Sequence, residues 1–437
     1  YDVLYSDEDR MSENGAHYYE PRFKPEFDID LLREYNYISH LFVAKRSLMQ
    51  MDGGFHSALD GAQGYDMILR CCEGNRSICH IPYVLYHKRI HDGTSEEREI
   101  KHAQENQAGK EALEAHIERE HLFARVMLTE QRSVYEVKYD TLGNPLVSMV
   151  VTGHTDRALM NRMLEPFYEK TRYSNFEISI VDQDSEDSEL QKYYQEMQNR
   201  RRNISVVTAP AGKSQTEYRN LGSIRANGAY VLFLDANLEI GDSAALGEML
   251  GIAMREDVGV VTGTLYDDRE RLYAAGLEFS GAYETMVQRW QAQTERMVDL
   301  TTERQLYRYR YRGLTDFETW KDMRRVQRDE TGAMRYYGMN REYEIVPVYC
   351  MLVKKQVFMR LGGFSDKFRT ELSVLDFCLR VREHGYRIVN AAHAKWQFHD
   401  LPDAVRMKCE AANIDAQVDF AERDLFEILW SHVLSLR

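Results

Sequence analysis

The residues best placed to do chemistry stand at the ends of two apolar runs. "YVLFLDAN" (230–237) passes from the apolar run 231–234 directly into Asp235, Ala236 and Asn237. "FEISIVDQDSED" (176–187) ends in the same way, with Asp182 as its first carboxylate after the run. Carboxylate and amide oxygens are the ligands that hard divalent cations prefer. The first run therefore suggests a cation site, in which Asn237 supplies a neutral oxygen where a carboxylate would add charge.

These runs belong to a pattern of strands alternating with helices. "PLVSMVVTGHTD" (145–156), "NISVVTAP" (203–210) and "AYVLFLDAN" (229–237) are expected strands, and "KSQTEYRNLGSIRANG" (213–228) is an expected helix that Gly228 ends. This alternation predicts a doubly wound, mostly parallel α/β sheet with helices on both faces. Ligands of such sheets bind beyond the carboxyl ends of the strands, where Asp182 and Asp235 are placed.

An internal repeat organises the chain. "DGGFHSALDGAQGYDMILR" (52–70) resembles "LGGFSDKFRTELSVLDFCLR" (361–380), and "ICHIPYVLYHKR" (78–89) resembles "IVNAAHAKWQFHD" (388–400). Asp66 and His87 are 21 positions apart, and Asp376 and His399 are 23 apart. Upstream, "VLYSDEDRMSENG" parallels "TGTLYDDRERLYAAG". Residues 1–90 are therefore predicted to be the second half of a module whose later copy includes about 258–400.

The predicted boundaries follow from this repeat. Residues 1–124 are expected to be the half module with a trailing polar helix, 125–144 a linker, and 145–402 a complete module. Residues 283–343 are an expected insertion in it, and 403–437 an expected C-terminal helix. Within the insertion, "YRYRYRG" (307–313) interleaves arginine with tyrosine. It suits either a phosphate or sugar contact or the solvated face of a helix.

Composition excludes several classes. The net charge of −14 argues against a general nucleic-acid binder, and 43% hydrophobic residues argue against a disordered chain. No run approaches the ~20 apolar residues of a membrane span, and no signal peptide is recognisable. Tyr1 stands inside an expected strand, so we expect a longer parent protein. The six cysteines form no CxxC pair and are expected to be reduced thiols of a cytosolic protein.

In order and spacing these pieces resemble family 2 glycosyltransferases with a GT-A fold. The whole chain resembles bacterial polysaccharide enzymes with two such modules in tandem, the first truncated at its N-terminus. The resemblance implies a Rossmann-like, mixed and mostly parallel sheet. It rests on "VSMVVTGHTD", "IVDQDSED", "YRNLGSIRANGAYVLFLDAN", "GGFSDKF" with "LDFCLRVREHGYRIV", "YSDEDRMSENG", "YNYISHLFVAKRSL" and "IPYVLYHKR".

The resemblance implies transfer of a sugar, with inversion, from a UDP- or dTDP-type nucleotide sugar to a glycan or lipid-linked glycan. The product would be a bacterial surface polysaccharide or a glycoprotein glycan. A Mn²⁺ or Mg²⁺ ion offsets the charge of the leaving diphosphate, and a carboxylate accepts the acceptor's proton. The expected location is the cytoplasm, with peripheral association at the inner face of the plasma membrane. The alternative is a degenerate module that binds nucleotide, glycan or a partner enzyme without catalysis.

The resemblance also implies roles for individual residues. Each of these residues also has a structural interpretation without a role in binding: a carboxylate in a turn, a side chain on a solvated helix face, or a structural histidine. The donor would be bound by Thr152, Asp182, Arg219 and Asp235, and the metal by Asp235, Asn237 and His399, with His87 matching His399 in the first copy. Asp7, Glu8 and Asp9 are either a polar loop or an acceptor-side group.

The catalytic base is where the sequence departs from the family. Counted from "GGF", the base position holds Val374 in the second copy and Gly64 in the first, after Ser373 and Gln63. Neither Val374 nor Gly64 can accept a proton. Asp66 and Asp376 are expected to be structural residues of a helix start. Glu371 is the nearest replacement, and loss of a general base typically costs ~10²–10⁴-fold in rate.

Overall fold

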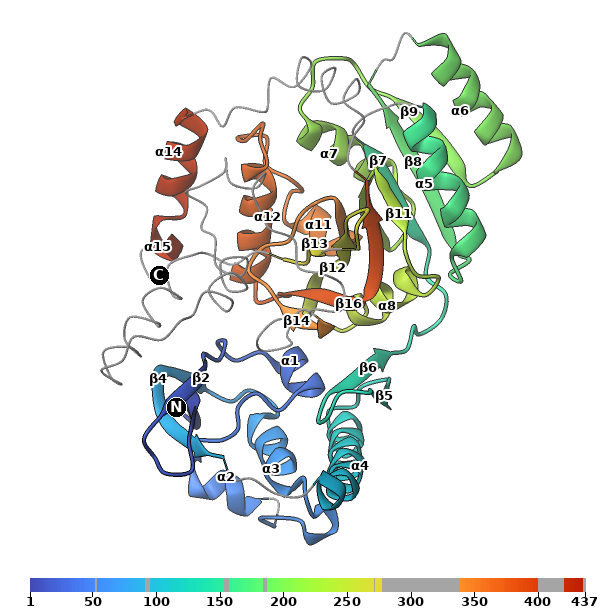
Figure 1. The fold of residues 1–437 in the computed structure, drawn as a ribbon. Helices are drawn as coiled ribbons and strands as arrows, with labels where there is room; N and C mark the ends of the chain where they lie inside the picture. Colours follow the sequence, from blue (N-terminus) through green and yellow to red (C-terminus); the bar gives the residue numbers. More distant parts are fainter. Residues whose placement is uncertain are drawn as a thin grey trace. The chain divides into compact units, whose positions relative to one another are not determined.

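The computed structural model describes residues 1–51, 53–90, 95–152, 157–183, 187–270, 272–276, 338–399 and 420–434 (Figure 1). These divide into two compact units. The first contains 1–140 and 338–341, and the second contains the described residues from 141 to 276, from 342 to 399 and from 420 to 434. Most of the expected insertion 283–343, including 307–313, and residues 403–419 of the expected C-terminal helix lie outside the described residues. No helix in these ranges is long and apolar enough to cross a membrane.

The second unit is built on a mixed, mostly parallel sheet in the order β11-β16-β12-β15-β10-β7-β8-β9. The four strands from β7 to β10 run parallel, and β15 is antiparallel to both of its neighbours. This arrangement matches the expected α/β class. The strands are β7 (Val147–Thr152), β8 (Phe176–Asp182), β9 (Ile204–Thr208), β10 (Tyr230–Asp235), β11 (Leu238–Ile240), β12 (Val258–Tyr266), β13 (Leu272–Ala274), β15 (Cys350–Lys354) and β16 (Arg387–Phe398). The two-residue strand β14 (Arg341–Glu342) falls at the unit boundary.

Helices cover both faces of this sheet (Figure 1). They are α5 (Arg157–Lys170), α6 (Ser188–Arg200), α7 (Gln215–Arg225), α8 (Ala245–Ala253), α11 (Lys355–Arg360), α12 (Leu372–Glu383), α14 (Phe420–Leu429) and α15 (Ser431–Leu434). One apolar cluster joins Val150 and Phe233 of the sheet to α7, α11, α12 and α14. On the other face, Phe167 of α5 contacts Phe176 edge-on. A capping box of Ser214 and Glu217 begins α7.

Close packing places α7 against the sheet at a glycine. A β-carbon on Gly222 would lie 2.3 Å from Val150 Cγ1, far inside van der Waals contact. Glycine at this position therefore lets α7 approach β7.

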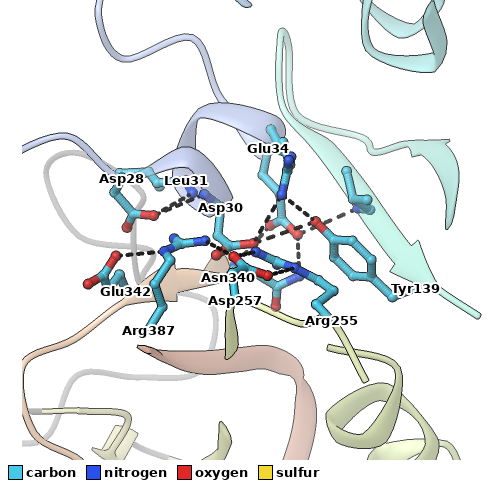
Figure 2. A network of polar contacts seen from close by, with 12 residues as sticks. Asp28, Asp30, Leu31, Glu34, Tyr139, Arg255, Asp257, Asn340, Glu342 and Arg387 are labelled. Carbon is cyan, nitrogen blue, oxygen red and sulfur yellow. Dashed lines mark hydrogen bonds and ion pairs between the residues drawn. The ribbon is translucent and has the colours of Figure 1, made fainter. Parts of the chain in front are cut away.

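Elsewhere in the second unit, Asp257 joins two arginines. Ion pairs link Arg255 to Asp257 at 2.8 Å and Arg387 to Asp257 at 3.1 Å, and Arg387 also contacts Glu342 at 2.9 Å (Figure 2).

The first unit contains a smaller sheet in which β1 pairs with β2, β3 and β4. Its strands are β1 (Val3–Met11), β2 (Tyr18–Arg22), β3 (Phe42–Ala44) and β4 (Ile78–Arg89), and its helices are α1 (Ile29–Glu34), α2 (Arg46–Met51), α3 (Gln63–Cys72), α4 (Ser95–Arg119) and the short 3₁₀ helix Ser57–Leu59. Asp28 caps α1, and Glu34 accepts hydrogen bonds from the backbone and side chain of Asn340 (Figure 2).

Residues 125–144, expected to be a linker, contain more structure than a linker needs. β5 (Ala124–Leu128) and β6 (Tyr135–Tyr139) pair antiparallel as a separate two-stranded sheet. Alternate residues of β6 are buried, including Tyr135 and Val137. This ribbon packs as part of the first unit, whose boundary falls after Asp140.

The repeat seen in the sequence has a counterpart in strand pairing. β1 is antiparallel to β2 and β3 and parallel to β4. β12 has the same three partners in the same directions: β13, β15 and β16. The two units thus share one four-strand arrangement, and the second unit extends it through β10, β7, β8 and β9.

The "GGF" turn is tied to the following helix in both units. Arg70 donates to Asp66 at 2.8 Å and to the Gly54 carbonyl at 2.6 Å. Arg380 contacts Asp376 at 2.8 Å and donates to a carbonyl of the equivalent turn at 2.9 Å. Asp66 and Asp376 therefore hold the turn against the helix, which agrees with the structural role expected of them.

Candidate functional site

Three neighbouring parallel strands deliver polar side chains to one edge of the second unit's sheet. β10, β7 and β8 end at Asp235, Thr152 and Asp182. Asp235 lies opposite Thr152 in the strand register, so both side chains point to the face covered by α7. The Asp235 amide donates to the Tyr349 carbonyl at 3.1 Å, which fixes the strand end.

Three predicted residues come together at this edge. Arg219 of α7 contacts the Asp235 carboxylate at 3.7 Å through Nη2 and the Glu371 carboxylate at 3.5 Å through Nη1. Arg219 is buried, whereas Glu371 is half exposed just before the first residue of α12. One guanidinium thus bridges a strand end and a helix start that are 136 positions apart in the sequence (371 − 235).

The pKa of the Asp235 carboxyl reflects the electrostatics of this cluster. Burial is the largest cause that raises its pKa, and the neighbouring Glu371 adds to it. Arg219 acts in the opposite direction, and the net result is a pKa of about 6 against an ordinary 3.8. The side chain keeps 20% of its surface exposed, so the charged form remains in reach of solvent and ligand. Two carboxylates and one guanidinium give the cluster a net negative charge at neutral pH.

Asp182 lies apart from this cluster. It is fully buried, and side-chain alternation along β8 places it on the face opposite Asp235. One carboxylate oxygen accepts a hydrogen bond from Gln191 of α6 at 2.9 Å. Its backbone carbonyl accepts from Ala209 at 2.8 Å, which closes the end of β9 onto β8. The Asp182 carboxylate is thus held from α6, whereas Asp235 is held from α7.

Asn237 and His399 also meet. The His399 amide donates to the Asn237 carbonyl at 3.0 Å, and Asn237 Nδ2 donates to the His399 carbonyl at 3.3 Å. Asn237 Oδ1 is buried and has no hydrogen-bond partner among the described residues. His399 faces a carboxylate at each ring nitrogen: Asp268 at Nδ1, and Glu239 at 3.2 Å from Nε2. Hydrogen bonds from Lys170 and His399 outweigh burial and lower the pKa of Glu239.

The predicted metal ligands fit a cation in part. Asp235 offers a carboxylate held only at 3.7 Å by Arg219, and Asn237 offers a buried oxygen that no donor in the described ranges occupies. His399 does not fit as placed, because both of its nitrogens face carboxylates. In the part of the chain that the structure describes, no three His, Cys, Asp or Glu side chains form a metal-binding group. The set Asp235, Asn237 and His399 stays a prediction.

In the second unit, a residue of the hydrophobic core occupies the position of the family's catalytic base. Val374 is buried in the apolar cluster beneath α12, and Ser373 bonds Thr216 of α7 through their hydroxyls at 2.6 Å. Neither faces Asp235. The equivalent Gly64 of the first unit is exposed, and its neighbour Gln63 bonds the Gly61 amide at 3.0 Å. Glu371 is therefore the carboxylate of this segment that reaches the cluster.

Sequence reasoning missed several residues of this edge. Asp268 stands in "LYDDRER", which the repeat aligned without indicating a contact to His399. Glu239 follows Asn237 by two positions, a spacing that puts both on one face of a strand. Tyr349 had no sequence signal. Burial raises its pKa well above the ordinary 10, and the nearby Glu371 and Asp235 charges act in the same direction.

Residues 150–311 match the family model of glycosyl transferase family 2. The protein y4gI of Sinorhizobium fredii is 27% identical over 402 residues, covering 91% of this chain and 40% of the relative. The O-antigen biosynthesis protein RfbC of Myxococcus xanthus is 27% identical over 399 residues, covering 91% of this chain and 28% of the relative. The chain thus spans less than half the length of these relatives.

Two solved structures overlap more loosely. A mannosyltransferase of Pyrobaculum calidifontis, in complex with GDP-Man and Mn²⁺, is 14% identical with a TM-score of 0.39, covering 59% of this chain and 58% of its own. GalNAc-T7, with UDP, GalNAc and Mn²⁺, is 11% identical with a TM-score of 0.42, covering 63% and 47%.

The second unit is a doubly wound α/β unit with polar groups at the carboxyl edge of its parallel strands, which is the edge where ligands of such sheets bind. The match over 150–311 makes the identification more specific. Over this stretch the chain is similar to family 2 glycosyltransferases.

Proposed function

We propose that the second unit transfers a sugar from a nucleotide-sugar donor to a glycan acceptor in the assembly of a bacterial surface polysaccharide or glycoprotein glycan. The observation that carries this proposal is the Arg219 bridge between Asp235 and Glu371 at the carboxyl edge of β10 and β7. It supplies a cation for a diphosphate and two carboxylates at the place where this class of sheet binds ligands.

Each residue of the sheet edge has a proposed role that follows from its position. Thr152 contacts the donor from the Asp235 side of the sheet edge, whereas Asp182, at the end of the neighbouring strand and on the opposite face, supports the nucleoside end of a UDP- or dTDP-type donor from the α6 side. Arg219 faces its diphosphate, and Asp235 lies beside it. A diphosphate adds negative charge to a cluster that is already net negative, so a divalent cation, Mn²⁺ or Mg²⁺, is expected to enter with the donor. When bound, that ion would neutralise charge on the leaving diphosphate, held by Asp235 and Asn237.

Glu371 is the proposed general base. It is half exposed at the helix start, so an acceptor hydroxyl can approach it from solvent. Its contact with Arg219 at 3.5 Å aims the carboxylate at the cluster. As Glu371 takes the hydroxyl proton, the acceptor oxygen bonds to the anomeric carbon on the face opposite the diphosphate. The bond from that carbon to the diphosphate breaks, the nucleoside diphosphate leaves, and the configuration is inverted.

A second function has its own observation. Val374 fills the family's base position with a buried apolar side chain, and Gly64 leaves the first unit's position without any. Both losses favour a degenerate domain that binds a donor, glycan or partner enzyme without turnover. We also propose a cytoplasmic location at the inner face of the plasma membrane, with a glycan or lipid-linked glycan as the acceptor. Support comes from the similarity to a Myxococcus xanthus protein of O-antigen biosynthesis.

The test uses the full chain with a panel of UDP-, dTDP- and GDP-sugars in Mn²⁺, Mg²⁺ or EDTA. Calorimetry measures donor binding, and release of free nucleoside diphosphate measures turnover. We expect binding that EDTA abolishes, and turnover that Asp235→Ala removes. Asp366→Ala is the matched control, because Asp366 is exposed in a turn of the same unit.

Glu371→Gln separates the two functions. In an enzyme it lowers turnover by ~10²–10⁴-fold, the range for a lost general base, and leaves donor affinity within about threefold. Binding without turnover in the unmodified chain would establish the degenerate domain. No binding of any donor would overturn the donor site altogether.

A further inference from the structure

The start of α12 determines where the Glu371 carboxylate points. Glu371 occupies the N-cap position, from which a side chain often accepts a hydrogen bond from the first turn of the helix. Within the described residues the Glu371 carboxylate forms no such cap, and it contacts Arg219 at 3.5 Å instead. Glu371 is therefore available to the cluster because another group fixes the helix start.

Thr370 supplies that group. Its hydroxyl oxygen accepts a hydrogen bond from the Leu372 amide at 3.4 Å, and its carbonyl accepts from the Ser373 amide at 3.1 Å. The hydroxyl proton of Thr370 is donated to Oε2 of Glu422 at 2.9 Å. Because a hydroxyl has only one proton, donating it to Glu422 leaves the oxygen lone pairs for the Leu372 amide. Thr370 is 7% exposed, so little water competes for these contacts.

Glu422 holds this segment from a helix much later in the sequence. It lies in α14, 51 positions after Glu371 (422 − 371). Its second carboxylate oxygen, Oε1, accepts a hydrogen bond from the Arg369 amide at 2.9 Å. Hydrogen bonds to a carboxylate are stronger than those between neutral groups. One carboxylate therefore binds two consecutive residues, Arg369 and Thr370, directly before Glu371.

The helix that carries Glu422 is itself fixed to the second unit, where it lies beside α12 (Figure 1). Phe426, one helical turn after Glu422, contacts Phe368 edge-on with 5.8 Å between the ring centroids. Trp430, the residue after α14, donates to Asp376 Oδ1 at 3.1 Å. Phe426 and Trp430 are both buried. These contacts hold Glu422 in place over the segment that precedes α12.

We propose that Glu422 is a positioning residue for Glu371: it fixes residues 369 and 370 from α14, so that the Glu371 carboxylate faces Arg219. This inference rests on the proposed function, in which Glu371 is the general base, and Glu422 acts only through Glu371. The helix α7, which carries Arg219, is joined to α12 separately, because the hydroxyls of Thr216 and Ser373 bond at 2.6 Å. Loss of the Glu422 carboxylate should therefore loosen the start of α12 and leave Arg219 in place.

The first measurement concerns the segment itself, in the full chain without substrate. Hydrogen exchange compares Glu422→Ala with Asp424→Ala, a matched control at an exposed carboxylate of the same helix. We expect exchange in 369–372 to become about tenfold faster in Glu422→Ala and to stay within about twofold in the control. Thr370→Val removes the hydrogen bond from its other side and should change exchange in the same direction.

The second measurement is a double-mutant cycle on donor turnover with Glu371→Gln. Glu422→Ala should lower kcat about tenfold and leave the donor KM within about twofold, because a misplaced base slows the chemical step. In the Glu371→Gln background the same substitution should have no further effect. Glu422→Gln keeps an acceptor for the Arg369 amide and should recover part of the loss.

Unchanged exchange in 369–372, or an equal loss of kcat in both backgrounds, overturns this inference and leaves the proposed function standing. No donor turnover in the unmodified chain overturns the proposed function and, with it, the role of Glu371 on which the inference rests. Faster exchange in Glu422→Ala would then show that the contact itself is real. Cooperative thermal unfolding checks that each variant is folded, and if Glu422→Ala is not, Glu422→Gln and Thr370→Val carry both measurements.

Discussion

The two units share one half of their structure and differ in the other half. Both have the same four-strand arrangement, the same Asp–Arg tie of the "GGF" turn, and a His–Asp contact where the two parallel strands end. That contact joins His87 to Asp9 at 2.5 Å in the first unit and His399 to Asp268 in the second. Only the second unit has β7 to β10, which bring Asp235 to Arg219. The contacts that hold the shared half together are thus duplicated, whereas the proposed donor site needs β7 to β10, which in the described residues belong to the second unit.

Buried thiols allow this comparison to be measured within one chain. The five cysteines in the described ranges are free, with Cys72 buried in the first unit and Cys378 buried in the second. Burial raises the pKa of both thiols, that of Cys378 to about 12. Neither therefore reacts until its unit opens. Pulsed alkylation along a urea series, followed by mass spectrometry, reports the free energy of unfolding of each unit separately.

The largest expected effect concerns the two base positions. Val374→Asp places an unpaired carboxylate in the apolar cluster and should lower the free energy of unfolding of the second unit by about 4 kcal/mol. Gly64→Asp is its matched control: Gly64 is exposed, and a β-carbon added there would have no atom within 4 Å, so the first unit should change by less than about 0.5 kcal/mol. Retained Cys378 protection together with increased donor turnover in Val374→Asp would show that this position reaches the donor site.

The duplicated Asp–Arg tie should give the next largest effect, and an unequal one. Asp66 and Arg70 are both buried, so Asp66→Ala leaves a buried guanidinium unpaired and should cost the first unit about 3–4 kcal/mol. Arg380 keeps 21% of its side chain exposed, so water can replace part of its contact after Asp376→Ala, and the remaining loss includes the buried hydrogen bond that Trp430 Nε1 donates to Asp376 at 3.1 Å. We expect about 2 kcal/mol there. Equal losses at Cys72 and Cys378 would contradict the role assigned to burial.

The sequence was sufficient to predict most of the shared half. Periodic apolar runs and the repeat predicted which segments of the two units correspond, because each strand carries its own burial pattern. They did not predict the order of the strands in the sheets. Asp376 and His399 are two positions further apart in the sequence than Asp66 and His87, and this difference has a physical basis. From Tyr5 to Asp9 are four positions, and from the register-equivalent Thr262 to Asp268 are six. From Ile78 to His87 are nine, and from the register-equivalent Ile388 to His399 are eleven, so both segments of the second unit gain two residues before the contact. The extension keeps the histidine and aspartate in contact.

The site was less predictable. Strand ends indicated Asp235 and Thr152, but whether Arg219 faces them depends on the rotation of α7, which Gly222 sets through packing on Val150. The role expected of His399 also depended on neighbours that spacing does not reveal, since Asp268 and Glu239 are fixed by pairing across strands. Residues 125–144 were expected to be a linker, and β6 in this segment pairs with β5.

A smaller effect separates function from stability in the second unit. The pKa of Asp235 is raised to about 6 from 3.8, so the folded state binds this proton more tightly than the unfolded state. The ionised carboxylate therefore lowers stability, by an amount that grows as pH rises from 3.8 to 6 and is constant above. Asp235→Asn should stabilise the second unit by about 2 kcal/mol at pH 7.5 while abolishing donor turnover. The gain should vanish near pH 3.5.

Asp366→Asn controls for the loss of one negative charge, since Asp366 is exposed. It should change neither Cys378 protection nor turnover. If Asp235→Asn destabilised the second unit at pH 7.5, the contact with Arg219 would outweigh burial, and the pKa of Asp235 would lie below its ordinary value.

The smallest expected effect is a pH dependence confined to the first unit. Burial lowers the pKa of His80, but hydrogen bonds to the carboxylates of Asp7 and Glu26 outweigh it and the net pKa is raised. A raised histidine pKa gives stability that is complete below about pH 6.5 and is lost as pH rises through the folded value. Cys72 protection should therefore fall by about 1 kcal/mol between pH 6 and pH 8.5, the scale of one hydrogen bond. His80→Gln should remove this change, whereas His17→Gln, at an exposed position of the same unit, should keep it. The same fall at Cys378 in the unmodified chain would show that the two units do not unfold independently, because the His80 contacts lie within the first unit alone.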